Sequence, residues 1–79
     1  MERNYKAEIE AILFTMGESV DINKIANALE IKPSEVKKIV KEMQKEMDTP
    51  ERGVKIIELD GAYQMCTKPE MYEALIKVA

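Results

Sequence analysis

The chain has 79 residues, of which 46% are hydrophobic and 34% are charged, and its formal net charge is -3. This composition is typical of one small folded domain and lies far from the low hydrophobicity and high net charge of disordered chains. The acidic balance argues against a protein that wraps nucleic acid, although it is compatible with a local basic patch.

The residues that catalysis, metal binding or membrane insertion would need are scarce. The sequence has no histidine and only one cysteine, Cys66, so it predicts neither an internal disulfide nor a metal site. It has no glycine-rich phosphate loop and no suitably spaced carboxylate pair, so we expect no enzyme, no cofactor and no small-molecule substrate. No apolar run approaches the roughly 18 residues of a membrane span, and no signal-peptide core is present, so we expect a cytoplasmic protein.

Residues 4–16 predict a first helix, which Gly17 ends as a C-terminal cap. One apolar stripe follows helical spacing and comprises Tyr5, Ile9, Ile12, Leu13 and Met16. A second apolar strip lies on the opposite side and comprises Ala7, Ala11 and Phe14. We therefore expect this helix to be covered on both sides, either within a small bundle or by a subunit contact that includes Phe14.

A helix-turn-helix is predicted next. Asp21 can cap a short helix over residues 22–29, and Pro33 occupies the favoured first position of a longer helix over residues 33–47. The core-facing residues of the longer helix are Val36, Ile39, Val40, Met43 and Met47. The opposite side carries a row of lysines, which are Lys37, Lys38, Lys41 and Lys45, and one flank carries Glu35, Glu42 and Glu46.

A β-hairpin is predicted over residues 54–67. Its two strands, residues 54–59 and 62–67, flank Asp60 and Gly61, a pair suited to the positive φ angles of a two-residue turn. Such a turn sets Leu59 opposite Ala62 and alternates the side chains between two faces. The face expected to pack on the helices carries Val54, Ile56, Tyr63 and Met65.

The other face of the hairpin is also partly apolar. It carries Ile57, Leu59, Ala62 and Cys66, together with Lys55 and Gln64. Because the helices can cover only one face, these four apolar residues and Phe14 form a candidate dimer or partner surface. A differently shaped turn, or the last helix that starts after Lys68, could cover this face instead. The parts together predict an α+β, mainly helical, winged-helix domain over residues 1–79: a helix, a helix-turn-helix, a two-stranded wing and a C-terminal helix.

The sequence also resembles a known family. The segments AEIEAILFTMGESVDINKIANAL, RGV, GAYQM and TKPEMY, at these spacings, resemble the N-terminal domain of bacterial segregation and condensation protein B. The match covers nearly the whole chain. Two positions depart from the family pattern: Ser19 stands where proline is frequent, and Cys66 stands where an aliphatic residue is commoner.

The resemblance implies a non-catalytic protein-interaction and dimerisation module of an SMC–kleisin complex for chromosome condensation and segregation. It implies a homodimer, a kleisin partner (ScpA-type), the SMC ATPase as a partner through the full-length protein, and association with the nucleoid. It also implies a second winged-helix domain, which is absent from this chain.

A DNA-binding transcription regulator is the alternative function. The third helix enters the major groove in DNA-binding winged helices, and its lysine row could contact phosphates. The row includes no arginine, and only Gln44 offers an amide near its edge, so we expect at most weak, non-specific DNA binding.

Overall fold

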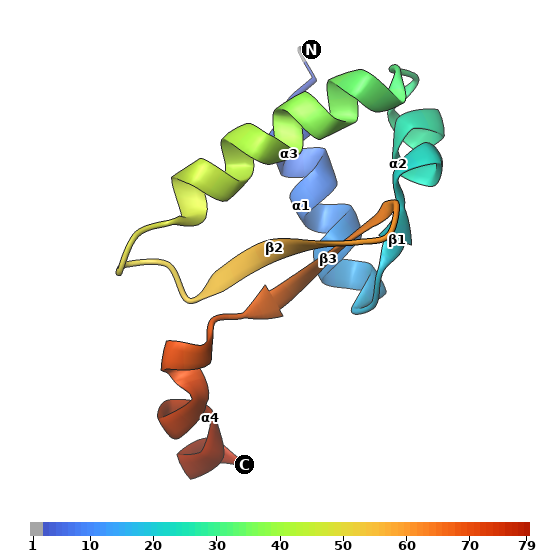
Figure 1. The fold of residues 1–79 in the computed structure, drawn as a ribbon. Coiled ribbons are helices and arrows are strands. Elements are labelled where there is room, and N and C mark those ends of the chain that lie inside the picture. Colours follow the sequence, from blue (N-terminus) through green and yellow to red (C-terminus); the bar gives the residue numbers. More distant parts are fainter. Residues whose placement is uncertain (1–2) are drawn as a thin grey trace.

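The computed structural model describes residues 3–79, which form four α-helices and a three-stranded antiparallel sheet (Figure 1). The order along the chain is α1 (Tyr5–Met16), β1 (Val20–Asp21), α2 (Ile22–Leu29), α3 (Pro33–Met47), β2 (Val54–Leu59), β3 (Ala62–Thr67), the 3-10 turn η1 (Pro69–Met71) and α4 (Tyr72–Val78). This is a winged helix, as the sequence predicted.

The hairpin has the predicted turn and register. Asp60 and Gly61 have φ angles of 42° and 81°, and Leu59 pairs with Ala62. Two positive φ angles in succession match the right-handed twist of the flanking strands, which is why a short loop holds this register. The two faces of the hairpin therefore carry the side chains assigned to them from the sequence.

The prediction of a two-stranded sheet was incomplete. Val20 and Asp21 form a third strand, β1, which pairs with β3 through Val20 opposite Tyr63 and Asp21 opposite Ala62. A two-residue strand is too short to show alternating hydrophobicity, so its sequence gave no strand signal. Asp21 still caps α2 as expected, because its carboxylate accepts a hydrogen bond of 2.7 Å from the amide of Asn23.

One hydrophobic core lies between α1, α2, α3 and the inner face of the hairpin. Its most buried residues are Ile9, Leu13, Ile25, Leu29, Val36 and Val40, each with less than 2% of its surface exposed. The hairpin contributes Ile56 and Tyr63, which are 4% and 3% exposed. Since an isolated hairpin is marginally stable in water, this burial is what holds the wing on the helices.

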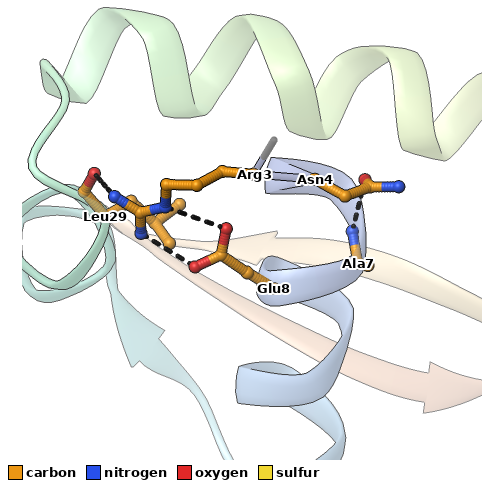
Figure 2. A network of polar contacts seen from close by, with 5 residues as sticks. All are labelled: Arg3, Asn4, Ala7, Glu8 and Leu29. Carbon is orange, nitrogen blue, oxygen red and sulfur yellow. Dashed lines mark hydrogen bonds and ion pairs between the residues drawn. The ribbon is translucent and has the colours of Figure 1, made fainter. Parts of the chain in front are cut away.

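The start of the described chain links α1 to the end of α2 (Figure 2). The guanidinium of Arg3 donates to both carboxylate oxygens of Glu8, at 2.8 and 3.2 Å, and to the carbonyl oxygen of Leu29 at 3.1 Å. Asn4 caps α1 by accepting from the amide of Ala7 at 3.1 Å. The hydrogen bond from Arg3 lowers the pKa of Glu8 below its ordinary value.

The expectation that α1 is covered on both sides within the domain was wrong. Ala7, Ala11 and Phe14 are exposed, and Phe14 keeps 67% of its surface accessible. Only the stripe that includes Ile9 and Leu13 packs inward. The domain has too few elements to cover a second side of α1, so its second apolar strip faces outward.

The C-terminal helix turns away from the body. The chain leaves β3, passes through η1 and continues as α4, which projects from the sheet on the side away from α3 (Figure 1). Among residues 3–79, its only substantial packing is against η1. The sequence left open the possibility that the last helix covers the outer face of the hairpin. In the structure, α4 does not cover this face.

Candidate protein-interaction surfaces

The outer face of the hairpin is partly accessible in the domain. Leu59 is 44% exposed, while Ile57, Ala62 and Cys66 are half-buried. Strand register brings these four residues to one face, because Leu59 pairs with Ala62 and Cys66 pairs with Lys55. This group, Ile57, Leu59, Ala62 and Cys66, is called the outer hairpin face below.

Phe14 is not part of the outer hairpin face. It belongs to α1, which buries Ile9 and Leu13 in the same core as Ile56 and Tyr63 on the inner side of the hairpin. The five residues predicted as one partner surface thus divide into two separate exposed regions, one on α1 and one on the wing.

The lysine row of α3 is exposed. Among residues 3–79, none of Lys37, Lys38, Lys41 and Lys45 forms a salt bridge. The acidic flank of the same helix is used inside the domain instead, because Lys6 of α1 contacts Glu46 at 2.7 Å and Glu42 at 3.6 Å. The hydrogen bond with Glu46 raises the pKa of Lys6. Docking of α1 thus uses the carboxylates and leaves the lysines unpaired.

Two lysines of the row, Lys41 and Lys45, also line a groove of about 490 Å³ between the end of α3 and the base of the hairpin. Its remaining lining residues are Gln44, Met47, Asp48, Lys55, Ile56, Lys68 and Glu70. This groove was not predicted from the sequence, because Lys55 and Lys68 reach it from segments distant in sequence from α3. Four lysines against two carboxylates make it basic.

Two side chains in the groove are engaged by backbone carbonyl groups. Gln44 donates from Nε2 to the carbonyl oxygen of Ile56 at 2.9 Å, which ties α3 to β2. Lys68 donates from Nζ to the carbonyl oxygens of Met47 and Thr49, at the end of α3. Gln44 was the only candidate for reading a base, and its amide is therefore occupied within the domain.

The tip of the hairpin is also tied to the body. The amide of Ile22, the first residue of α2, donates to the carbonyl oxygen of Gly61 at 3.0 Å, and β1 pairs with the start of β3. The tip thus lies beside the start of α2 and is not a free wing that extends along the lysine row of α3 (Figure 1).

The most exposed apolar surface lies on α4 and was not among the surfaces predicted from the sequence. Four of the seven large apolar side chains left exposed within residues 3–79 belong to this helix: Tyr72 (67%), Leu75 (46%), Ile76 (54%) and Val78 (87%). The sequence signal was the apolar pattern after Pro69. That pattern predicts a buried face but does not say where the helix docks.

Residues 3–79 contain neither a candidate metal site nor a membrane-spanning helix. Residues 3–79 hold no group of three or more cysteine, aspartate or glutamate side chains that could bind a metal ion. Within the same range, each helix is too short or too polar to cross a lipid bilayer.

These elements define a winged-helix domain of the β1-β3-β2 type, whose exposed features are two apolar regions, a lysine row and a projecting helix. The family model described as segregation and condensation complex subunit ScpB matches residues 7–79. The chain belongs to this family, which confirms the resemblance seen in the sequence.

Curated relatives agree with this assignment. The chain is 60% identical over 77 residues to segregation and condensation protein B of Agathobacter rectalis and 51% identical over 77 residues to that of Lachnoclostridium phytofermentans. These alignments cover 96% and 98% of this chain but only 41% of each relative. The chain thus spans about two fifths of the length of these relatives.

Solved structures share the fold. A crystal structure of a dimer of the ScpB N-terminal domain complexed with a ScpA peptide matches with a TM-score of 0.88 and 35% identity, over 94% of this chain and 93% of that chain. ScpB of Mycobacterium tuberculosis matches with a TM-score of 0.87 over 99% of this chain and 51% of that chain. Because its sequence identity is only 20%, the second match supports the shared fold and nothing further.

Proposed function

We propose that this domain is a non-catalytic interaction module that self-associates within a chromosome segregation and condensation complex and contributes to binding a kleisin subunit. The observation that carries the proposal is the match to a solved N-terminal domain of nearly the same extent, which is a dimer complexed with a ScpA peptide. Family membership supports it, as do the apolar regions that this fold leaves exposed.

The proposal extends to the longer protein. Because the curated relatives are more than twice as long, a full-length protein would hold a second winged-helix domain and would meet the SMC ATPase through the complex. Its place in the cell would be the cytoplasm, at the nucleoid. The exposed Leu59 and Phe14 would belong to the self-association or kleisin-binding surface of this first domain.

Sedimentation equilibrium, from micromolar to millimolar concentration, tests self-association of the 79-residue chain. Titration with a kleisin peptide, followed by calorimetry, tests partner binding. We expect a dimer that binds the peptide, whereas a chain that stays monomeric at all concentrations contradicts the self-association proposal. A dimer that ignores the peptide contradicts only the kleisin contact.

DNA binding is a second candidate, favoured by the unpaired lysine row and by Lys55 in the adjoining groove. We propose that any such binding is weak and non-specific, because lysines supply phosphate attraction without base discrimination, and because Gln44 is engaged by Ile56. Fluorescence anisotropy against salt tests this. We expect affinity to fall steeply with salt for every duplex sequence, and to fall further in Lys41→Glu. Tight, sequence-dependent binding at physiological salt would support a regulator instead.

A further inference from the structure

Within residues 3–79, the last helix, α4, has no substantial packing partner apart from η1. The seven residues of α4 span about 10 Å at 1.5 Å per residue, and an isolated helix shorter than about 12 residues is marginal in water. Its substantial packing is limited to η1, and its four large apolar side chains are 46 to 87% exposed. Some other surface must cover this helix for it to be stable.

The apolar surface of α4 is unusually broad. At about 100° per residue, Ala74, Val78, Leu75, Tyr72 and Ile76 occupy roughly 200° of the helix circumference. Glu73 and Lys77 share the narrow remaining side, one turn apart. A helix that lies on a single surface typically needs an apolar stripe of about 100°. The pattern on α4 therefore fits a helix that is enclosed on more than one side.

A second copy of the chain is the occupant that the comparison favours. The solved ScpB N-terminal domain aligns with this chain over 93% of its own length, and it is a dimer. A domain of this extent therefore forms a dimer without a long segment after α4. The interface must use surface within these residues, and α4 offers the largest share of exposed apolar side chains.

We propose that α4 is a dimerisation arm, which packs its broad apolar face on the second copy while the second copy's α4 packs reciprocally. This rests on the self-association proposed above. A stable interface involves about 20 to 30 residues on each partner, so the seven residues of α4 cannot form it alone. Body surface, with the outer hairpin face as one candidate, completes the interface under the same two-fold symmetry.

The experiment compares two double variants of the 79-residue chain. Leu75→Asp with Ile76→Asp adds two aspartates to the apolar face, whereas Glu73→Asp with Lys77→Asp adds two aspartates to the polar side. Both variants lower the net charge by two, so they differ only in which side of α4 is changed. Because α4 has no substantial packing beyond η1 within residues 3–79, both variants should keep the circular dichroism spectrum of the folded body.

Sedimentation equilibrium gives the dissociation constant of each dimer. We expect Leu75→Asp with Ile76→Asp to raise it about 30-fold or more, as for interface hot spots, and the polar-side control to change it less than threefold. A chain that ends at Met71 lacks α4 and should be monomeric. Because this deletion adds no charges, it is a control for an indirect effect of the introduced aspartates.

The outcomes separate the two proposals. A wild-type chain that is monomeric overturns both the self-association and the arm. A wild-type dimer whose dissociation constant is unchanged by the apolar-face variant overturns the arm alone. Hydrogen exchange gives a second readout: the amides of residues 76–78 should become protected as the dimer forms.

Discussion

Lys68 stabilises the fold through hydrogen bonds that its position after β3 in the sequence does not predict. Its ammonium group donates to the carbonyl oxygen of Met47, the last residue of α3, where carbonyl groups lack partners within the helix, and to the carbonyl oxygen of Thr49, two residues further on. Its own amide donates to the carbonyl oxygen of Gly53 at 2.9 Å. One residue thus joins the end of α3 to the base of the hairpin.

Lys68→Met should lower the free energy of unfolding by about 1 kcal/mol, because it leaves the partly buried carbonyl group of Met47 without this donor, while that of Thr49 still accepts from the amide of Arg52 at 3.2 Å. The melting temperature should fall by roughly 4 to 8 °C per kcal/mol for a domain of this size. Urea unfolding measures the change. Lys38→Met, at an exposed and unpaired position, is the control and should stay within about 0.5 kcal/mol. Equal losses in the two variants would mean that the contacts of Lys68 carry no stability.

Glu8 should titrate at a lower pH than an ordinary glutamate, because Arg3 stabilises its charged form by a hydrogen bond. The pKa of Glu8 in the folded state lies below its pKa in the unfolded chain, which is about 4.3. The charged carboxylate therefore stabilises the fold at pH values above about 4.3. This contribution is lost as pH falls through the folded pKa. Both groups are exposed, so the effect on stability should be small.

An NMR titration of the Glu8 carboxyl carbon tests this coupling. Arg3→Met should raise the pKa of Glu8 toward its ordinary value, and Lys6→Met should leave it unchanged, since Lys6 pairs with Glu42 and Glu46 instead. An unchanged pKa in Arg3→Met would mean that the contact with Glu8 does not persist in solution.

At the scale of elements, the hairpin has one face that packs on the helices and one that is partly exposed. Ile56 is 4% exposed, whereas Leu59 is 44% exposed on the opposite face. Ile56→Lys should unfold the domain, because it buries a charge without a partner. Leu59→Lys should keep the melting temperature of the monomer within a few degrees while weakening self-association. Circular dichroism and sedimentation measure the two effects, and unfolding by Leu59→Lys would show that this residue belongs to the core.

Some of these elements could be predicted from the sequence, and others could not. The register of β2 and β3 was predictable, because Asp60 and Gly61 select one turn type and the turn determines every pairing. The strand β1 was not, because two residues carry no periodicity. For α1, the apolar strip with Phe14 was visible, but periodicity cannot distinguish a side covered inside the domain from one that faces outward.

The candidate surfaces were predictable only where they follow a local pattern. The lysine row of α3 and the outer hairpin face each lie within one element or one hairpin, so spacing alone defined them. The groove that includes Lys55 depends on the angle at which α3 crosses the hairpin, and the projection of α4 depends on the path through η1. Such tertiary arrangements leave no periodic signal in the sequence.

For the whole molecule, the small core limits stability, because a domain of this size buries a modest share of its surface. Self-association should increase the free energy of unfolding, because a partner that binds only the folded chain stabilises the folded state by mass action. The gain is about 2.7 kcal/mol when the partner concentration is 100 times the dissociation constant. The melting temperature should therefore rise with protein concentration in the wild-type chain and stay constant in the Leu75→Asp with Ile76→Asp variant. If the melting temperature of the wild-type chain does not change with protein concentration, folding and self-association are not coupled.

The pairing of β1 with β3 also sets when the domain can fold on the ribosome. Val20 leaves the exit tunnel about 40 residues before Tyr63, its partner across the sheet. At about 5 to 20 residues per second, this separation corresponds to roughly 2 to 8 s between the emergence of β1 and that of its partner strand, and the end of α3 at Met47 emerges about 1 to 3 s before Tyr63. Small domains commonly fold faster than this. Translation speed, more than the intrinsic folding rate, should therefore decide how long the apolar faces of α1, α2 and α3 are open to chaperones.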